Sequence, residues 1–187
     1  TWDFEGVDIQ VVGFHQVLSD AIVRIGVQTP GGAKRQRANR DRIRSTGLEL
    51  MGSGGWGRVQ YIGDLTLQQA WLIEDGSDVR TRPEYEPGVV GEFDVAMPVL
   101  GEFSLSGGYR FVGRQSCLNA ESGSMDTLSR THRFDLELRR FFTFEGRSAL
   151  GNVDAIVSVT NLTDSAIFDQ CGLPQPGRTF RIQVRLF

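Results

Sequence analysis

The chain has 187 residues, of which 40% are hydrophobic and 23% are charged, and its formal net charge is -3. This composition is typical of a folded protein and excludes a disordered segment, and the small negative charge gives no electrostatic footprint for nucleic acid. No apolar run approaches the roughly 20 residues of a membrane-spanning helix, so a helical membrane protein is excluded. Membrane barrel strands need only about 9 to 11 residues each and remain possible.

Short segments rich in β-branched and aromatic residues recur along the whole chain, separated by clusters of Gly, Pro, Asp and Asn. This pattern is typical of many strands, and no segment indicates a helix. We expect residues 1–187 to form a single β-barrel piece with about eight antiparallel strands, in chain order near 6–20, 40–51, 57–73, 88–98, 102–113, 130–144, 149–163 and 177–187.

Apolar and polar residues alternate within these segments, so that each strand has one apolar and one polar face. The residues expected to face lipid are Phe103, Leu105, Tyr109, Phe111, Phe134, Leu136, Leu138, Val157 and Val159. The opposite faces carry charges such as Arg133, Asp135 and Glu137, which suit a hydrated barrel interior where neighbouring strands can pair them. A soluble antiparallel sandwich shows the same alternation and is an alternative.

The connections between the expected strands alternate in length. The tight ones are 51–56, 98–102 and 144–150, and the long polar ones are 24–41, 74–87, 113–130 and 164–177. Short turns at one end and long loops at the other are typical of membrane barrels. Aromatic rings sit at both membrane interfaces, so we expect Trp56 and Phe144 near the periplasmic rim and Trp71 near the outer one.

Catalytic and metal-binding patterns are weak in this sequence. Two carboxylate pairs lie two residues apart on one strand face, a spacing that could serve glycoside hydrolysis, but the basic residues nearby favour ion pairs; they are Glu92 with Asp94 and Asp135 with Glu137. His15 and His132 have no Cys or acidic residue at ligand spacing. No nucleophile elbow, phosphate loop or dinucleotide fingerprint is present. We therefore expect no enzyme activity, no cofactor and no metal site.

The last thirty residues carry a more specific pattern. A strand that ends in V-x-N-L-x-D is followed by a loop and by P-G-R-x-F at the start of the last strand; the residues are Val159, Asn161, Leu162, Asp164, Pro176, Gly177, Arg178, Phe180 and the terminal Phe187. Two further motifs lie upstream: Asn39 followed by Gly47, Leu48 and Glu49 in one expected strand, and Asp20 with Ile22 at the end of the strand before it. In this order the motifs resemble the C-terminal part of TonB-dependent outer-membrane receptors.

The resemblance implies an all-β, antiparallel up-and-down transmembrane barrel of about 22 strands, of which this chain would supply the last eight or so, without the plug domain. Phe187 departs from the family by standing one position out of phase with Phe180 and Leu186.

The same resemblance implies a receptor in the bacterial outer membrane that imports a siderophore, cobalamin or glycan. The implied partners are the rest of the barrel, the plug, TonB acting through the plug, membrane lipid and an extracellular ligand. The loops at 24–41 and 74–87 are expected to contact that ligand. In such a barrel the first and last strands of this chain do not pair. A stand-alone eight-stranded barrel with a structural or adhesive role, in which they do pair, is the alternative.

The two cysteines, Cys117 and Cys171, fall in the long connections after the fifth and seventh expected strands. These connections are neighbours in an up-and-down barrel, because the sixth and seventh strands pair. The cell surface permits disulfides, so we expect a bridge between the two loops. The alternative is that each thiol packs singly in its own loop.

Overall fold

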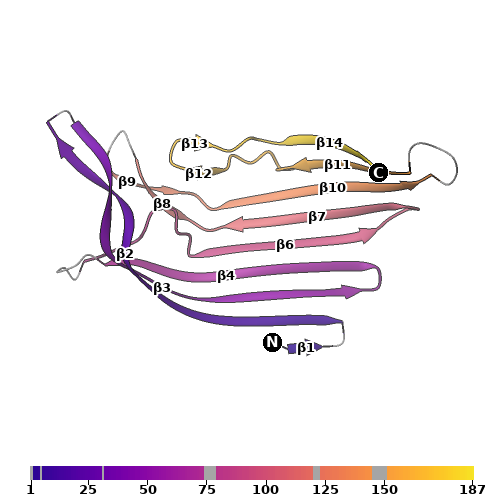
Figure 1. Ribbon diagram of the computed structural model, residues 1–187, viewed down its shortest axis with the longest axis horizontal. Coiled ribbons are helices and arrows are strands. Elements are labelled where there is room, and N and C mark those ends of the chain that lie inside the picture. Colours follow the sequence, from indigo (N-terminus) through magenta and orange to yellow (C-terminus); the bar gives the residue numbers. More distant parts are fainter. Residues whose placement is uncertain (1, 5, 31, 74–78, 120–122, 145–150) are drawn as a thin grey trace.

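The computed structural model describes residues 2–4, 6–30, 32–73, 79–119, 123–144 and 151–187, and one antiparallel sheet dominates it (Figure 1). In spatial order the sheet contains β1 (Trp2–Phe4), β2 (Val7–Thr29), β3 (Gly32–Trp56), β4 (Val59–Ile73), β6 (Val89–Pro98), β7 (Phe103–Val112), β10 (Thr131–Thr143), β11 (Asn152–Thr160) and β14 (Thr179–Leu186). The short β5 (Arg80–Thr81) pairs with β4. Within these ranges no helix is long and apolar enough to cross a membrane.

Two small hairpins stand outside the main sheet. One joins β8 (Gln115–Leu118) to β9 (Met125–Leu128), and the other joins β12 (Phe168–Gln170) to β13 (Leu173–Pro174). All eight expected strands are present as the long strands of the main sheet, so the all-β antiparallel prediction is confirmed. The two hairpins lie in connections for which the sequence predicted only loops.

The main sheet is open. Its edges are β1 and β14, and among the described strands β14 pairs only with β11. A closed eight-stranded barrel requires β14 to pair with β2, so that alternative is wrong. The sandwich alternative is also wrong, because all the long strands belong to one sheet. The prediction that the first and last strands do not pair is confirmed.

The β2–β3 hairpin is longer than the sequence predicted. Its register runs without a long loop from Val7 opposite Gly54 to Thr29 opposite Gly32, so the expected loop at 24–41 is wrong. In Figure 1 this hairpin continues beyond the other strands at the left end of the view. The backbone hydrogen bonds of an antiparallel ladder join the two strands over this whole length.

The expected turn at 51–56 is also wrong, because β3 continues to Trp56 and the chain turns at Gly57, where φ is +62°. The glycines of this segment allow close packing within the sheet. A Cβ atom at Gly54 would lie 2.6 Å from the Oη atom of Tyr61 on the neighbouring strand β4. Glycine at this position therefore makes room for an aromatic ring and does not form a turn.

The two ends of the sheet differ as the sequence predicted. At the end that we call the turn end, β3 is joined to β4 at Gly57 and Arg58, and β6 to β7 through residues 99–102. The expected turn at 144–150 lies outside the described residues, apart from Phe144. At the opposite end, the loop end, lie the connections that contain β5, the β8–β9 hairpin and the β12–β13 hairpin.

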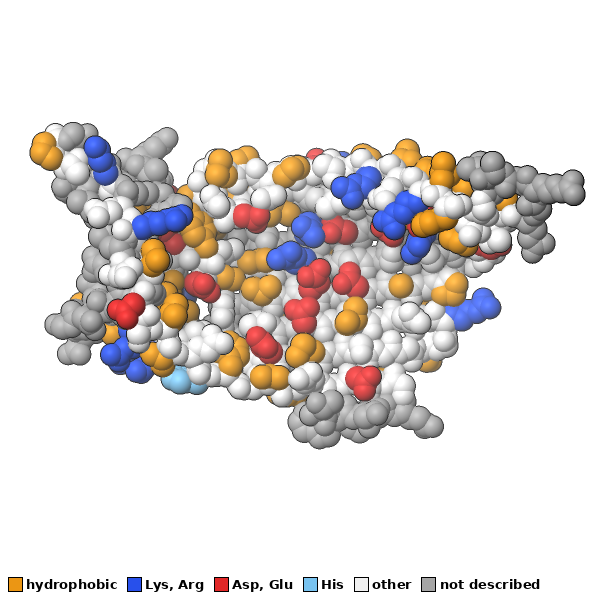
Figure 2. All heavy atoms as spheres, viewed as in Figure 1, with side chains coloured by type: hydrophobic (Ala, Val, Ile, Leu, Met, Phe, Trp, Pro, Cys, Tyr) orange, Lys and Arg blue, Asp and Glu red, His pale blue; other side chains and the backbone are white. Residues whose placement is uncertain are grey.

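The strand register assigns the side chains to two faces. On the apolar face, Leu136 stands opposite Gly107 and Val159, and Leu138 stands opposite Leu105 and Val157. All nine residues predicted to face lipid lie on this face. We call the other side the charged face; it carries Glu92, Asp94, Arg110, Arg133, Asp135, Glu137, Arg139, Asp154, Arg181 and Arg185. Figure 2 shows acidic and basic side chains gathered across the middle of the visible face.

The described residues contain almost no hydrophobic core. Only Cys117, Ile156 and Ile167 are buried hydrophobic residues. On the apolar face Phe134 is 41% exposed and Leu136 is 40% exposed, although both lie in the interior of the sheet. An uncovered apolar face of this extent marks a surface that contacts another apolar phase.

Candidate functional site

An ion pair crosses the charged face between β10 and β11. The guanidinium of Arg139 donates from Nε to Oδ1 of Asp154 over 2.7 Å, and from Nη2 to Oδ2 over 2.9 Å. The Asp154 side chain is fully buried, whereas the Arg139 side chain is 49% exposed. Bidentate geometry strengthens such a pair and fixes the orientation of both groups. Arg139 and Asp154 thus pair across neighbouring strands, in the way expected for the charged faces of these strands.

A second ion pair lies nearer the loop end. Arg133 Nε donates to Oδ2 of Asp135 over 3.0 Å, and both side chains are about one-third exposed. The other carboxylate oxygen, Oδ1, accepts the backbone N–H of Asn161 over 2.9 Å. Asp135 therefore connects the charged face of β10 to the first residue of the loop after β11.

Asn161 begins a compact corner at that point. Its backbone has a φ of 55°, in the left-handed region that asparagine tolerates better than most residues. Its side-chain amide donates to the Ser165 carbonyl over 2.9 Å, and its Oδ1 accepts the Ser165 N–H over 3.0 Å. Asn161 is 1% exposed. Both polar atoms of the buried Asn161 side chain are thus hydrogen-bonded to the backbone of Ser165.

Asp164 closes the corner onto the P-G-R segment. It also has a left-handed backbone, with a φ of 54°. Its Oδ1 accepts the backbone N–H of Arg178 over 2.7 Å, and its Oδ2 lies 3.9 Å from the Arg178 guanidinium. A Cβ atom at Gly177 would lie 2.6 Å from Asp164 Oδ1. Glycine at this position therefore lets the carboxylate approach closely, and a larger residue would force the Asp164 side chain to shift.

The structure brings together four residues of the terminal motif and separates the others. Asn161, Asp164, Gly177 and Arg178 form the corner. Leu162 is 42% exposed, and its N–H donates to the Phe134 carbonyl over 2.7 Å. Phe180 stands opposite Val159 on the apolar face, and Phe187 bonds to Asn152 at the turn end. Four residues of the motif thus hold the chain in place where β14 begins. Its two aromatic residues, Phe180 and Phe187, lie outside this corner.

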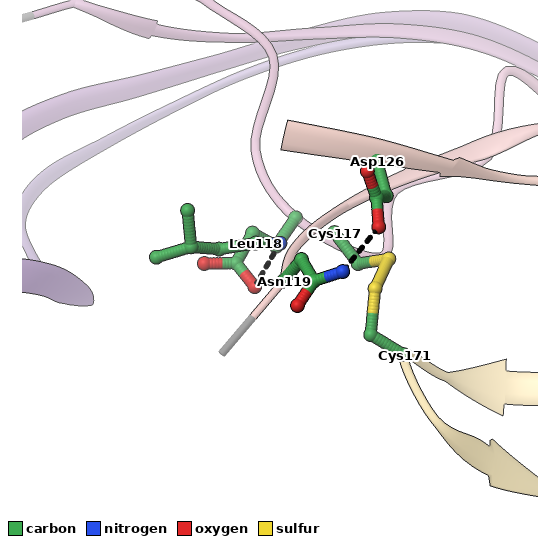
Figure 3. Close-up of a disulfide and its surroundings, with 6 residues drawn as sticks. Cys117, Leu118, Asn119, Asp126 and Cys171 are labelled. Atoms are coloured by element: carbon green, nitrogen blue, oxygen red, sulfur yellow. Dashed lines mark hydrogen bonds between the residues drawn. A yellow bond between two sulfur atoms is a disulfide. The ribbon is translucent and has the colours of Figure 1, made fainter. Parts of the chain in front are cut away.

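A disulfide between Cys117 and Cys171 joins the two hairpins of the loop end, with Cα atoms 6.0 Å apart (Figure 3). Cys117 is fully buried. Beside the bridge, Asn119 Nδ2 donates to Asp126 Oδ2 over 2.7 Å. The Leu118 N–H donates to Glu84 Oε2 over 3.2 Å, which ties the connection between β4 and β6 to the same cluster. Three loops are therefore held as one unit above the charged face.

A cavity of about 460 Å³ lies under these loops, where they meet the charged face. Arg110 and Arg133 from β7 and β10 line it, together with Gln115, Asp169, Gln175 and Tyr85 from the loops. The sequence predicted that residues 74–87 contact ligand, and Tyr85 and Pro87 belong to this cavity. Residues 24–41, the other predicted contact, contribute none of its described lining. The cavity was not predictable from the sequence because it depends on the folded positions of three loops.

Aromatic clusters occupy both ends of the apolar face. At the loop end, His132 Nδ1 lies 2.8 Å from Tyr109 Oη, and the His132 ring centroid lies 5.0 Å from that of Phe111. At the turn end, the guanidinium carbon of Arg140 lies 4.4 Å from the ring centroid of Phe142. The sequence analysis did not predict His132 or Arg140 on this face. Their even-numbered positions in β10, which alternate in phase with Phe134 and Leu138, could have indicated it.

No group of three or more metal-binding side chains occurs among the described residues.

No family model matches the chain. No curated protein matches it either.

Solved structures do match nearly its whole length. The ferric-catecholate import receptor Fiu from Escherichia coli K12 is 19% identical, with a TM-score of 0.68 over 96% of this chain. The FrpB iron transporter from Neisseria meningitidis is 16% identical with a TM-score of 0.70 over 98%, and the pyoverdine receptor FpvA from Pseudomonas aeruginosa PAO1 is 14% identical with a TM-score of 0.67 over 97%. These structures are TonB-dependent outer-membrane receptors. The chain has the fold of part of their barrel.

The resemblance inferred from the terminal motif is thus confirmed at the level of the fold. The chain spans 25% of the Fiu chain, 29% of the FrpB chain and 27% of the FpvA chain. The open sheet is consistent with a chain that spans only about a quarter of each matched receptor, because a section of a larger barrel has two unpaired edges.

Proposed function

We propose that this chain forms a section of the wall of a TonB-dependent receptor in the bacterial outer membrane, and that the intact receptor imports a scarce large nutrient. The observation that carries the proposal is the open antiparallel sheet with one uncovered apolar face and one charged face. Exposed strand edges are prohibitively costly in lipid, so further barrel strands must cover β1 and β14. The plug, through which TonB would act, and those strands are the proposed partners.

The dimensions of the apolar face support placement in a bilayer. His132 and Phe142 mark its two aromatic ends on β10 and are ten residues apart. A rise of about 3.3 Å per residue and a strand tilt of about 40° separate them by about 25 Å along the membrane normal. That is about the height of the apolar band of an outer-membrane barrel. The turn end would then face the periplasm and the loop end the cell exterior.

The cavity under the loops supports a role in contacting the nutrient. It opens between the disulfide-linked loops and the charged face, and two arginines line it. The two guanidinium groups outnumber the one carboxylate in the lining, Asp169, and an excess of guanidinium groups in a partly enclosed cavity favours an anionic ligand. We therefore propose that the nutrient is of the siderophore, cobalamin or glycan class, and that the siderophore class suits the cavity best. The names of matched structures refer to ferric-catecholate import, iron transport and pyoverdine binding.

Cysteine labelling in intact cells tests the membrane placement. The intact protein would carry one added cysteine at Thr81 in β5, at Leu136 in the middle of β10 or at Arg58 in the β3–β4 turn. With a membrane-impermeant maleimide we expect Thr81→Cys to react in whole cells, Arg58→Cys to react only after the outer membrane is permeabilised, and Leu136→Cys to react in neither case. Labelling of Leu136→Cys in intact membranes would contradict the proposal.

Uptake measurements test the transport role. A strain that lacks the intact protein should lose accumulation of one radiolabelled nutrient from a panel of ferric siderophores, cobalamin and oligosaccharides, and the wild-type gene should restore it. Replacement of Arg110 by Gln should raise the half-saturating concentration of an anionic nutrient, because the substitution removes a positive charge from the cavity. Unchanged uptake of every member of the panel in the deletion strain would contradict a nutrient-import role.

A further inference from the structure

The apolar face carries one arginine at its turn end whose charge no described residue balances. Arg140 follows Leu136 and Leu138 in the same phase of β10. It stands opposite Phe103 of β7 and Ala155 of β11, so its side chain leaves the sheet on the apolar side. The described ion pairs of the sheet lie on the charged face or at the loop-end corner and do not include Arg140.

Two aromatic rings hold the Arg140 guanidinium. Its central carbon lies 4.8 Å from the ring centroid of Phe103 and 4.4 Å from that of Phe142. Phe144 extends the cluster, with its ring centroid 6.5 Å from that of Phe142. Cations over aromatic faces are attracted by the ring quadrupole. The rings therefore hold the position of the charge but leave it without a counter-ion.

The hydrogen bonding of this group is incomplete as well. Arg140 Nε is buried and has no hydrogen-bond partner within the described part of the chain. A buried donor that lacks a partner is costly, and such a donor on a cation costs more. An oxyanion at the open side of the guanidinium would supply the missing counter-charge and would accept hydrogen bonds from the accessible Nη groups, which offsets part of this cost.

The level of Arg140 in the bilayer identifies the source of that oxyanion. The midpoint between His132 and Phe142 marks the midplane on β10, and Arg140 lies three residues beyond it, which is about 10 Å along the strand and about 8 Å along the membrane normal at a tilt of about 40°. The hydrocarbon band ends about 12 Å from its midplane. An arginine at this level extends its charged group towards the phosphates of the adjacent leaflet.

We propose that Arg140, Phe103 and Phe142 form a binding site for the phosphate of a phospholipid in the leaflet at the turn end. The guanidinium binds the phosphodiester through two N–H donors, and the rings bind the glycerol and upper acyl region. The acyl chains then run along Leu138 and Leu136 on the apolar face. This site rests on the membrane placement proposed above, and it assigns a specific lipid contact to the wall of the barrel.

Native mass spectrometry of the intact receptor tests the site, with phosphatidylglycerol as the probe in a mild detergent. We expect the wild type to retain one phosphatidylglycerol molecule that Arg140→Gln loses, with a decrease in affinity of about tenfold or more. Phe142→Leu should weaken retention less, because the charge remains. Arg140→Lys should be intermediate, because lysine keeps the charge without the planar fork. It also provides a folded variant if Arg140→Gln does not assemble.

Arg58→Gln is the matched control. Arg58 lies at the same end of the sheet, in the β3–β4 turn, and is exposed. It should retain phosphatidylglycerol as the wild type does. Equal retention of phosphatidylglycerol by the wild type and Arg140→Gln would overturn the proposed site. Equal loss of phosphatidylglycerol from Arg140→Gln and Arg58→Gln would also overturn it, because it would indicate that any positive charge at this end attracts the lipid. Labelling of Leu136→Cys separates the failures, since a protected Leu136→Cys with unchanged lipid retention rejects the lipid site and leaves the membrane placement intact.

Discussion

The Arg139–Asp154 pair contains the most deeply buried carboxylate among the ion pairs of the described residues. Its carboxylate is fully buried and its guanidinium is half exposed, so the free-energy cost of losing one partner differs from that of losing the other. Without Asp154, water can solvate Arg139. Without Arg139, a buried carboxylate loses both of its charged donors, and an unpaired buried charge is strongly destabilising.

We therefore expect Asp154→Ala to lower the free energy of unfolding by about 1 to 3 kcal/mol, and Arg139→Ala to lower it by more. Urea unfolding of the intact protein in lipid vesicles measures both effects. Arg133→Ala is the control, because the Arg133–Asp135 pair is partly exposed and should contribute about 1 kcal/mol or less. A smaller effect for Arg139→Ala than for Asp154→Ala would contradict the burial argument.

At the scale of elements, the corner between β11 and β14 explains why the terminal motif has its residue types. Two positions need a left-handed backbone, and Asn161 and Asp164 tolerate it. Their side chains then bond to Ser165 and to the backbone of Arg178. The corner thus sets where β14 enters the sheet.

We expect Asn161→Ala to destabilise the protein by about 2 kcal/mol or more, because it loses two side-chain hydrogen bonds and places alanine in the left-handed region. Proteolysis of residues 161–178 under native conditions should accelerate in the same variant. Thr163→Ala is the matched control in the same corner; Thr163 is exposed and loses only its contact with Ser165 Oγ, so its substitution should change stability by about 1 kcal/mol or less. Equal effects of the two substitutions would contradict the role of Asn161.

The disulfide acts on whole loops. Cys117 and Cys171 are 54 positions apart, and closing a loop of this length stabilises a protein by about 4 kcal/mol in the chain-entropy model. Non-reducing peptide mapping of native membranes should recover the two cysteines in one cross-linked peptide pair. Replacement of both by Ser should increase protease cleavage in the two hairpins and leave β10 protected. Alkylation of both thiols without reductant would show that the bridge is absent.

At the scale of the whole molecule, the two ends of the sheet should lie at the two faces of the membrane. Trp56 is 83% exposed at the turn end, whereas Trp71 lies on β4 at the loop end, with Arg82 5.7 Å from its ring. In variants that keep one of these tryptophans, we expect quenchers confined to one leaflet to quench only one of them. Phe144, replaced by Trp, should follow Trp56. Quenching of all three from the same leaflet would contradict this arrangement.

Much of this fold could be predicted from the sequence, and each of the two errors has its own physical cause. The eight long strands and the residues of their two faces follow from alternation, which reports a local property of each strand. The predicted loop at 24–41 was wrong because the polar composition of this segment was taken as the sign of a loop, whereas backbone pairing continues through it and needs no alternation of apolar and polar residues. The predicted turn at 51–56 was wrong because Gly54 contacts the ring of Tyr61 on another strand.

The sequence by itself determined the strands, their apolar and charged faces and the terminal motif, because side-chain direction in a strand alternates with period two wherever the strand lies. Only the tertiary structure decided that the sheet stays open, that Arg139 meets Asp154, and that three loops enclose a cavity at Arg110 and Arg133. These features join residues from different strands, and their positions depend on register and loop packing. A shift of one residue would move every one of these side chains to the opposite face.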